Sequence, residues 1–277
     1  MTRTVPTLEQ RQRTTRRVLI AGATLATLWI LLPLYFLLVN AWSSPEAVNA
    51  FPKQLWPEMD SGSVRFLLGF DGVISALVNS LAVAFMTMAA SILIGAPAGY
   101  ALARFEFHGK GTFRMLIMLT RAFPLPLLAL PLTVLFIRVG LDDSLFGLAL
   151  VHTILALPFS VLITYSLFSG IPVELEEAAW VFGCNRFDAF VRVVMPLAWP
   201  GIMASAVFAF IISWNEVFAS AVLTIQNRTL TAFLLQNLDY SPMHLKFAGG
   251  ALLVVPAAVF MFLIRKQLFA MWGISNR

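Results

Sequence analysis

The sequence predicts an all-α membrane protein with six transmembrane helices. Of its 277 residues, 59% are hydrophobic and only 12% are charged, and the mean hydropathy is +0.83. A soluble domain carries about 25% charged residues, so this chain has too few to cover a surface in water. Six apolar runs reach the length of about 20 residues that a membrane-spanning helix needs. Lys and Arg lie in the connectors between these runs, where they indicate topology.

The expected spans are six runs with few or no charges. In order, they cover 18–40, 76–103, 114–137, 145–167, 197–223 and 247–264. The first follows Arg11, Arg13, Arg16 and Arg17 and therefore imitates a signal peptide, but it is longer than the hydrophobic region of about 7–15 residues in such a peptide. We therefore expect a retained helix.

The other five runs are defined by their flanking charges. The second is free of charge from Gly72 to Ala103 and the fourth from Ser144 to Val173. The third contains Arg121, the fifth reaches Glu216 before any charge, and the sixth lies between Lys246 and Arg265. Because Pro, Gly and charge positions limit boundaries only loosely, each end is expected within a few residues.

The distribution of Lys and Arg predicts that both termini are cytoplasmic. With the N-terminus inside, 13 of the 19 basic residues fall on the cytoplasmic side, five fall outside and Arg121 lies within a span. This asymmetry follows the positive-inside rule. We expect a cytoplasmic tail at 1–17, a membrane domain at 18–265 and a second cytoplasmic tail at 266–277. Connectors 43–75, 138–144 and 224–246 then face outward, and connectors 104–113 and 168–196 face the cytoplasm.

Composition also excludes several kinds of site. The net charge is +5, but the basic residues do not gather with aromatic residues on a polar surface, so nucleic-acid binding is not expected. Cys184 is the single cysteine, which rules out an internal disulfide and a thiolate-based metal site.

The cytoplasmic connector 168–196 is long for a helix–helix connection, where 2–8 residues are usual. Pro172 suits the first turn of a short helix, and acidic residues favour the positive end of its dipole. Gly183 suits a helix end with left-handed backbone geometry, and a second short amphipathic helix is expected before Pro196 and Pro200. The acidic residues of the first helix are Glu174, Glu176 and Glu177, and its expected apolar stripe is Leu175, Ala178, Ala179 and Phe182.

Two interpretations of this connector remain open from the residues alone. Carboxylates beside small alanines would let a soluble partner with a basic rim approach closely. Alternatively, the segment is an amphipathic hairpin on the membrane surface. Such helices are usually rich in Lys and Arg, whereas this one is acidic.

Residues 177–196 resemble the EAA loop of binding-protein-dependent ABC importer permeases. The pattern is Glu-Ala-Ala, three residues, Gly, nine residues, an aliphatic residue, one residue, and Leu-Pro. The matching positions are Glu177, Ala178, Ala179, Gly183, Val193, Met195 and Pro196. Phe182 replaces a common Asp, which removes one potential partner contact. The segments 100–107 and 214–216 are similar to sugar permeases of the maltose type, within which the chain resembles the smaller six-helix partner.

The resemblance implies the type I ABC importer (MetI-like) permease fold in the bacterial cytoplasmic (inner) membrane. It implies a non-catalytic subunit that alternates access as its coupling helix follows two ATP-binding cassette subunits. It also implies a second permease subunit in a heterodimer and an extracytoplasmic solute-binding protein. ATP and Mg would be bound by the ATPase subunits, and no cofactor by this chain. The coupling residues implied are Glu174, Glu177, Ala178, Ala179, Phe182, Gly183 and Pro196.

Polar residues within spans are costly and tend to face a bundle interior or a cavity. Candidates for a translocation path are Asn79, Arg121, Trp214, Asn215 and Glu216. Arg121 would pair with an anionic substrate group or else snorkel or bond to another helix. Glu216 would line the path or mark the outer end of its span, and Trp214 would stack on a sugar or lie at the interface.

His152 also lies within a span, and we expect it to be a packing residue with a satisfied hydrogen bond. The sequence contains no phosphate-binding GxxxxGK[ST] loop, so ATP must be bound by partners. An ion-coupled secondary transporter would need ionisable groups in several spans, and only Arg121 and Glu216 qualify. An intramembrane enzyme would need paired aspartates, a Ser/His dyad or an HExxH motif on spans, and the sequence indicates none. Sugars, polyols and glycerol phosphate all remain candidate substrates.

Overall fold

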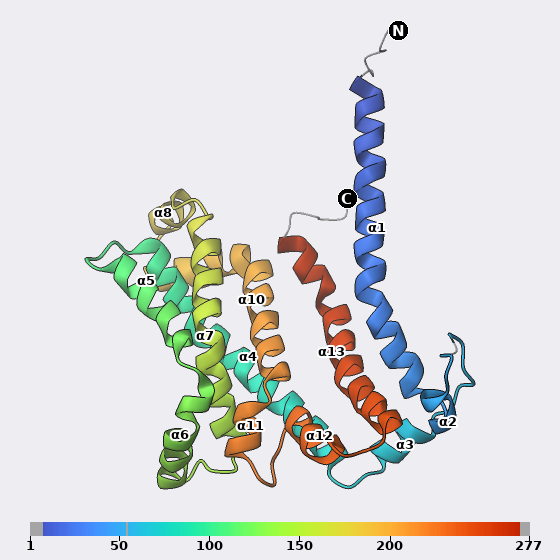
Figure 1. The fold of residues 1–277 in the computed structure, drawn as a ribbon. Coiled ribbons are helices and arrows are strands. Elements are labelled where there is room, and N and C mark those ends of the chain that lie inside the picture. Colours follow the sequence, from blue (N-terminus) through green and yellow to red (C-terminus); the bar gives the residue numbers. More distant parts are fainter. Residues whose placement is uncertain (1–7, 54, 272–277) are drawn as a thin grey trace. The chain divides into compact units, whose positions relative to one another are not determined.

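Helices form nearly all of the chain in the computed structural model, which describes residues 8–53 and 55–271, with side chains from 15 to 265 except residue 54 (Figure 1). The first four helices are α1 (Leu8–Ala41), α2 (Pro45–Asn49), α3 (Gly62–Leu68) and α4 (Val73–Arg104). The next are α5 (Lys110–Leu119), the 3-10 turn η1 (Thr120–Ala122), α6 (Leu125–Val139), α7 (Leu145–Ser169) and α8 (Glu174–Val181). The last are α9 (Arg186–Ala189), the π turn η2 (Phe190–Val194), α10 (Met195–Asn215), α11 (Phe218–Leu223), α12 (Leu230–Leu238) and α13 (Met243–Met271).

Within the described residues, five helical segments are long and apolar enough to cross a membrane, and a sixth span results if α5 and α6 count as one. The predicted all-α fold class is therefore confirmed. The expected tails reach beyond the described residues, since 1–7 and 272–277 lie outside them. Helix α1 already begins at Leu8 and α13 continues to Met271.

The chain divides into two compact units. The first comprises residues 1–68 and 240–252, and the second comprises residues 69–239 and 253–277. Within the first unit, Gly250 of α13 packs so closely on α1 that an added Cβ would lie 3.1 Å from Leu37. The connector after α2 is attached to α1 by the Tyr35 hydroxyl, which donates to the Leu55 carbonyl at 2.5 Å.

The second unit is built on the packing of α4 against α7 and α10. Gly95 and Gly99 lie one turn apart on α4, and a Cβ on Gly99 would come within 2.7 Å of the Tyr165 backbone nitrogen. Small residues at this spacing allow two helix backbones to approach closely where lipid removes the usual hydrophobic driving force. Figure 1 shows α5 and α8 at one end of this unit and α6, α11 and α12 at the other.

The third expected span is not one straight helix. Helices α5 and α6 meet at 87°, with η1 between them. Phe123 and Pro124 have extended backbone angles. Phe123 precedes a proline, and such a residue is disfavoured in the helical region. Pro124 and Pro126 also lack the N–H groups that a continuous helix would use. The expected third span over 114–137 is therefore bent and not one continuous helix, and Arg121 lies at the bend.

The fifth expected span ends eight residues early. Helix α10 stops at Asn215, and Glu216 is extended with ψ 127°. Both carboxylate oxygens of Glu216 accept from the Ala219 amide, at 3.0 and 2.9 Å, so this side chain replaces helical bonds at the start of α11. Residues 218–223 therefore form a separate short helix.

The second cytoplasmic helix was expected to be separate from the fifth span, and it is not. Residues Arg186–Asn215 form one continuous candidate span that passes through α9, the π turn and α10. Pro196 lies in the first turn of α10 and Pro200 inside it. Because Pro196 has no N–H, the hydrogen-bond ladder is already interrupted there, and the π turn directly before it accommodates the change.

Candidate functional site

Helix α8 forms a short acidic helix with well-defined ends. It starts two residues after Pro172, and Gly183 ends it with φ +91°. The amide of Gly183 donates to the Trp180 carbonyl at 2.9 Å and that of Cys184 to the Ala179 carbonyl at 3.0 Å. This pair of bonds is the Schellman arrangement. The predicted left-handed glycine stop is therefore present.

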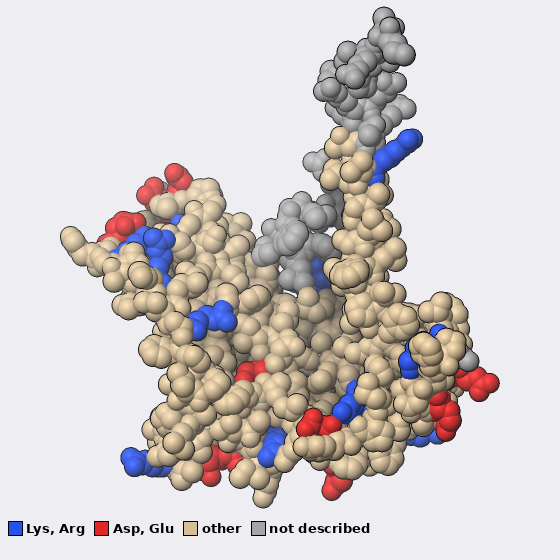
Figure 2. Space-filling view, in the orientation of Figure 1, with Lys and Arg blue, Asp and Glu red and all other residues tan. Residues whose placement is uncertain are grey.

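The surface of α8 away from the bundle is exposed and mixed in character. Glu174, Glu177 and Ala178 are exposed, and Phe182, just beyond the helix, is 88% exposed. Figure 2 shows acidic side chains gathered at the end of the molecule where Figure 1 places α8. We call Glu174, Glu177, Ala178 and Phe182 the outer face of α8.

The opposite side of α8 is buried and does not follow the expected stripe. Glu176 is 1% and Ala179 9% exposed, so these two residues point into the second unit. Ala179 was expected beside Ala178 on the surface offered to a partner. One helical position, about 100°, separates them, and this rotation places Ala179 against its own chain.

Glu176 joins two side chains of α4, which we call with it the Glu176 clamp (Tyr100, Arg104 and Glu176). The Arg104 Nε donates to Glu176 Oε1 at 2.5 Å, and the Tyr100 hydroxyl donates to Oε2 at 2.6 Å. Arg104 also donates from Nη2 to the Ile171 carbonyl at 3.0 Å. A buried carboxylate needs such partners, because leaving it unpaired would be strongly destabilising.

Aromatic rings surround the clamp. The Tyr100 ring lies 4.4 Å from that of Phe190 and 5.6 Å from that of Phe168, measured between centroids. Phe168 is near the end of α7, and Phe190 begins the π turn that leads into α10. The ends of α4, α7 and α10 therefore meet at the inner side of α8.

At the other end of the second unit, polar residues fix the segments around α11 and α12. Asn79 donates from Nδ2 to the Arg228 carbonyl at 3.1 Å. The Ser80 hydroxyl accepts from the Leu230 amide at 2.7 Å, and the Thr231 hydroxyl donates to the Glu216 carbonyl at 3.0 Å. The side-chain amide of Asn79, expected on a translocation path, is thus engaged with its own chain.

His152, Ser213 and Glu216 lie together, which the sequence did not indicate. His152 is 0% exposed, its Nδ1 is 2.8 Å from the Ser213 hydroxyl, and its Nε2 is 3.2 Å from Glu216 Oε2. The expectation that no Ser/His pair exists on the spans is therefore wrong. Ser213 is buried as well and Glu216 is partly buried, so the three residues connect α7 to the end of α10 inside the packed helices. His152 is a packing residue with a hydrogen-bond partner, as expected.

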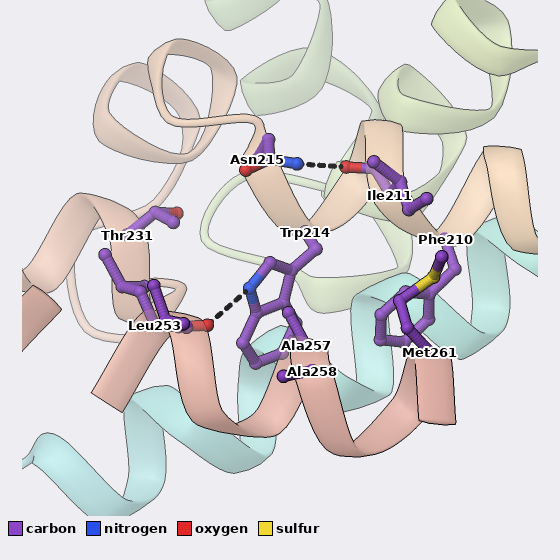
Figure 3. Close-up of a pocket in the computed structure, with 10 residues that line it drawn as sticks. Phe210, Ile211, Trp214, Asn215, Thr231, Leu253, Ala257, Ala258 and Met261 are labelled. Atoms are coloured by element: carbon purple, nitrogen blue, oxygen red, sulfur yellow. Dashed lines mark hydrogen bonds between the residues drawn. The ribbon is translucent and has the colours of Figure 1, made fainter. Parts of the chain in front are cut away.

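A cavity of about 360 Å³ opens between α10, α12 and the second half of α13 (Figure 3). Trp214 is only 4% exposed, and its indole N–H donates to the Leu253 carbonyl at 3.2 Å. Asn215 is exposed and donates from Nδ2 to the Ile211 carbonyl at 2.9 Å. Phe210, Met261 and Thr231 line the same cavity. The cavity is therefore mostly apolar, with an amide and a hydroxyl on its wall.

Arg121 is exposed at the bend between α5 and α6. Its guanidinium carbon lies 3.9 Å from the centroid of the Phe159 ring. A cation over an aromatic face is attracted by the ring quadrupole, which gives this charge one favourable contact within the chain. Arg121 does not join Asn215 in the cavity, so the structure separates two residues that were expected on one path.

Asp143 holds the connector 138–144 against the segment after α11, a contact that no sequence pattern indicated. Its carboxylate accepts from the amides of Ile225 at 2.8 Å, Gln226 at 3.1 Å and Asn227 at 3.0 Å. Burial opposes ionisation, but the hydrogen bonds from these three amides outweigh it and lower the pKa of Asp143 below its ordinary value. The connector is thereby held in one conformation.

The described chain is thus an integral membrane protein by the length and composition of its helices, with a short exposed acidic helix at one end of its second unit. The chain belongs to the family of binding-protein-dependent transport system inner membrane components, which matches residues 91–270. It is thus a permease subunit of an ABC importer.

Two curated relatives illustrate the similarity. The chain is 36% identical over 197 residues to a putative ABC transporter permease protein of Streptomyces antibioticus, covering 70% of this chain and 86% of the relative. It is 32% identical over 202 residues to a trehalose transport system permease protein of Mycobacterium tuberculosis, covering 71% and 74%.

Solved structures share the fold. A chain of a bacterial ABC transporter involved in the import of the acidic polysaccharide alginate matches with a TM-score of 0.68 at 22% identity, covering 98% of both chains. A chain of an inward-facing methionine ABC transporter matches with a TM-score of 0.59 at 19% identity, covering 78% of this chain and 100% of that one. At these identities the likeness concerns the fold alone.

Proposed function

We propose that this chain is one of the two membrane subunits of an ATP-driven importer of a sugar or sugar derivative. The importer lies in the bacterial cytoplasmic membrane, and both termini of this chain lie inside. The exposed outer face of α8 is the observation that supports coupling of this chain to the ATPase subunits. Relatives named for trehalose, diacetylchitobiose and α-glucoside transport support the sugar class. A polyol or glycerol phosphate is the alternative substrate.

The outer face of α8 fits a protein partner better than a lipid surface. Glu174 and Glu177 would be repelled by anionic lipid headgroups, whereas interfacial helices attach through Lys and Arg. Phe182 and Ala178 supply apolar contact beside these carboxylates. Each of two ATP-binding cassette subunits would receive one such helix, from this chain and from a second permease subunit in a heterodimer. ATP and Mg bind in those subunits, and this chain contributes no catalytic group.

In this mechanism, closure of the ATPase subunits moves α8 and switches the spans between inward-facing and outward-facing states. A ligand can shift such an equilibrium only through different affinities for the two states, and the ATP-bound dimer supplies that difference. An extracytoplasmic solute-binding protein would dock on connectors 43–75 and 224–246. Glu177 would anchor α8 by charge-assisted hydrogen bonds, Gly183 would set its turn, and Pro196 would lie in the first turn of α10, inside the following span.

The cavity at Trp214 and Asn215 is the proposed contact of this chain with the substrate path. The Asn215 side chain is exposed on its wall, and an amide can bind sugar hydroxyls both as donor and as acceptor. Glu216 shapes the backbone beneath it, while Asn79 holds the neighbouring loop. Arg121 is a separate candidate, because an exposed guanidinium at membrane depth requires water, a partner or an anionic group.

The proposal is tested with Glu177→Ala and Gly183→Arg in the assembled importer. Glu177→Ala removes the anchoring carboxylate, and Gly183→Arg forces a side chain onto a backbone with φ +91°. We expect ATP hydrolysis stimulated by the binding protein, and uptake, to fall about 10-fold or more, the effect of losing about 1.4 kcal/mol of coupling. If both activities stay unchanged in both variants, α8 does not couple this chain to an ATPase.

A further inference from the structure

The Glu176 clamp joins the buried inner side of α8 to α4. Both carboxylate oxygens of Glu176 are held, one by Tyr100 and the other by Arg104, at 2.6 and 2.5 Å. Tyr100 and Arg104 are four residues apart and so lie on the same side of α4. Helix α8 cannot slide or rotate against α4 without breaking both bonds.

A second contact joins the same two elements. The guanidinium of Arg186 lies 5.5 Å from the ring of Trp180 in α8 and 5.9 Å from that of Phe105, the residue after α4. The far side of α8 stays exposed at Glu177 and Phe182. One short helix therefore has a free side for a partner and an opposite side that is fixed to α4.

The chemistry of the clamp favours transmission of force over stability. A buried ion pair loses much of its attraction to desolvation, and well-packed apolar residues often stabilise a fold as well or better. Charge-assisted hydrogen bonds, however, are short and directional, whereas apolar side chains can slide past each other. A directional link is what a helix needs to pull or rotate its neighbour.

We propose that Tyr100, Arg104 and Glu176 are positioning residues that transmit the displacement of α8 to α4 and so link nucleotide binding to the opening of the spans. This inference rests on the proposed docking of an ATPase on α8. It assigns transmission to three residues that face away from that partner.

The test uses the importer assembled from this chain, its second permease, the ATPase and the binding protein. Cys184 is the single cysteine, so Cys184→Ser gives a background in which Leu235→Cys, exposed on α12, carries a fluorescent label. Two quantities are measured after addition of Mg-ATP and vanadate: nucleotide trapped by the complex, and the change in label fluorescence. Neither requires knowledge of the substrate.

The variants are Glu176→Gln, and Arg104→Met with Glu176→Met, which removes both charges so that neither is buried alone. The matched control is Glu106→Gln, which breaks the Lys110 pair that lies nearby but is exposed, with the Glu106 side chain 87% accessible. We expect trapped nucleotide within about twofold of wild type in all three proteins. The fluorescence change per trapped complex should fall at least about fivefold in the clamp variants and stay unchanged in the control.

A full fluorescence change per trapped complex in both clamp variants would overturn the proposal, since the residues would then serve folding only. Loss of trapping itself in both variants would overturn it as well, because the clamp would act on docking and not on transmission. If the wild-type complex traps no nucleotide, the proposed function fails instead, before the clamp is tested.

Discussion

Individual carboxylates in this chain hold connectors in place by accepting several hydrogen bonds each. Glu176 and Asp143 lie in different connectors, and each gathers bonds from groups distant in sequence. Ionised oxygens form stronger hydrogen bonds than neutral ones. A carboxylate can therefore fix a connector that has little apolar surface of its own.

Asp143 provides a prediction about stability and pH. Its pKa in the folded protein is lowered, so its ionised form stabilises the fold above the ordinary aspartate pKa of about 3.9. This contribution is lost as the pH falls through the lower, folded value. Asp143→Ala should cost about 1 kcal/mol at pH 7, the low end of the usual effect of removing hydrogen bonds to a charged group, because solvent screens this partly exposed carboxylate. Thermal unfolding of the purified complex at pH 7 and in steps below pH 4 (about the unfolded value) measures both effects.

Asp143→Asn is the matched control for that experiment. Residue 143 has φ +50°, which Asn tolerates, and the amide oxygen can still accept from the three backbone N–H groups. We expect Asp143→Asn to lose less stability at pH 7 than Asp143→Ala. Below pH 4 (about the unfolded value), residue 143 should then add nothing to the dependence of stability on pH. Equal stability of wild type and Asp143→Ala at pH 7 would contradict the role of this carboxylate.

At the scale of elements, close packing of α4 on α7 organises the second unit. Thr164 donates to the Gly95 carbonyl at 2.9 Å, and the side chain of Thr164 occupies the space that a Cβ on Gly99 would need, at 2.1 Å. This contact depends on the absence of a side chain. Helices in lipid rely on such packing because apolar burial contributes little there.

Gly99→Ala should therefore weaken the α4–α7 contact by about 1–3 kcal/mol, the usual cost of overpacking. Gly111→Ala is the control, because Gly111 is also helical but has no atom within 4 Å of an added Cβ. The melting temperature of the complex in detergent reports the difference. Equal melting temperatures of the two variants would show that the contact can relax without cost.

Helices could be predicted from the sequence where the pattern that indicates them lies within one segment of the chain. Charge-free runs predicted α4 and α7 within a few residues, and Gly183 predicted the end of α8. The sixth run lies inside α13, which begins four residues before it and ends seven residues after it. The bend at Pro124 was missed because hydropathy continues across it, although two prolines spaced by one residue could have indicated it. The Gly95–Gly99 spacing was likewise a readable sign of helix packing.

The site was less predictable because its contacts are distant in sequence. Glu176 looks like Glu174 and Glu177 in any local pattern, and only Arg104, 72 positions earlier, distinguishes it. The contact of His152 with Ser213 spans 61 positions. No periodicity within one segment carries such information, so both clusters needed the folded structure.

At the scale of the whole molecule, the two ends of the second unit hold two different candidate sites. One end holds α8, with an exposed outer face and the Glu176 clamp behind it. The other end holds the cavity at Trp214 and the loops fixed by Asn79, Ser80 and Asp143. Membrane-length helices connect these ends, as the proposed alternating access between an ATPase at one end and a delivery site at the other would require.

The most direct test of this account is a photo-crosslinker placed at Phe182, 88% exposed beside α8, in the assembled importer in its membrane. A crosslinker at Leu130, exposed on α6, serves as the control. We predict that position 182 crosslinks to the ATPase subunit and position 130 does not. Crosslinks from position 182 to lipid alone would contradict the account, because α8 would then lie on the membrane surface and would not receive the ATPase.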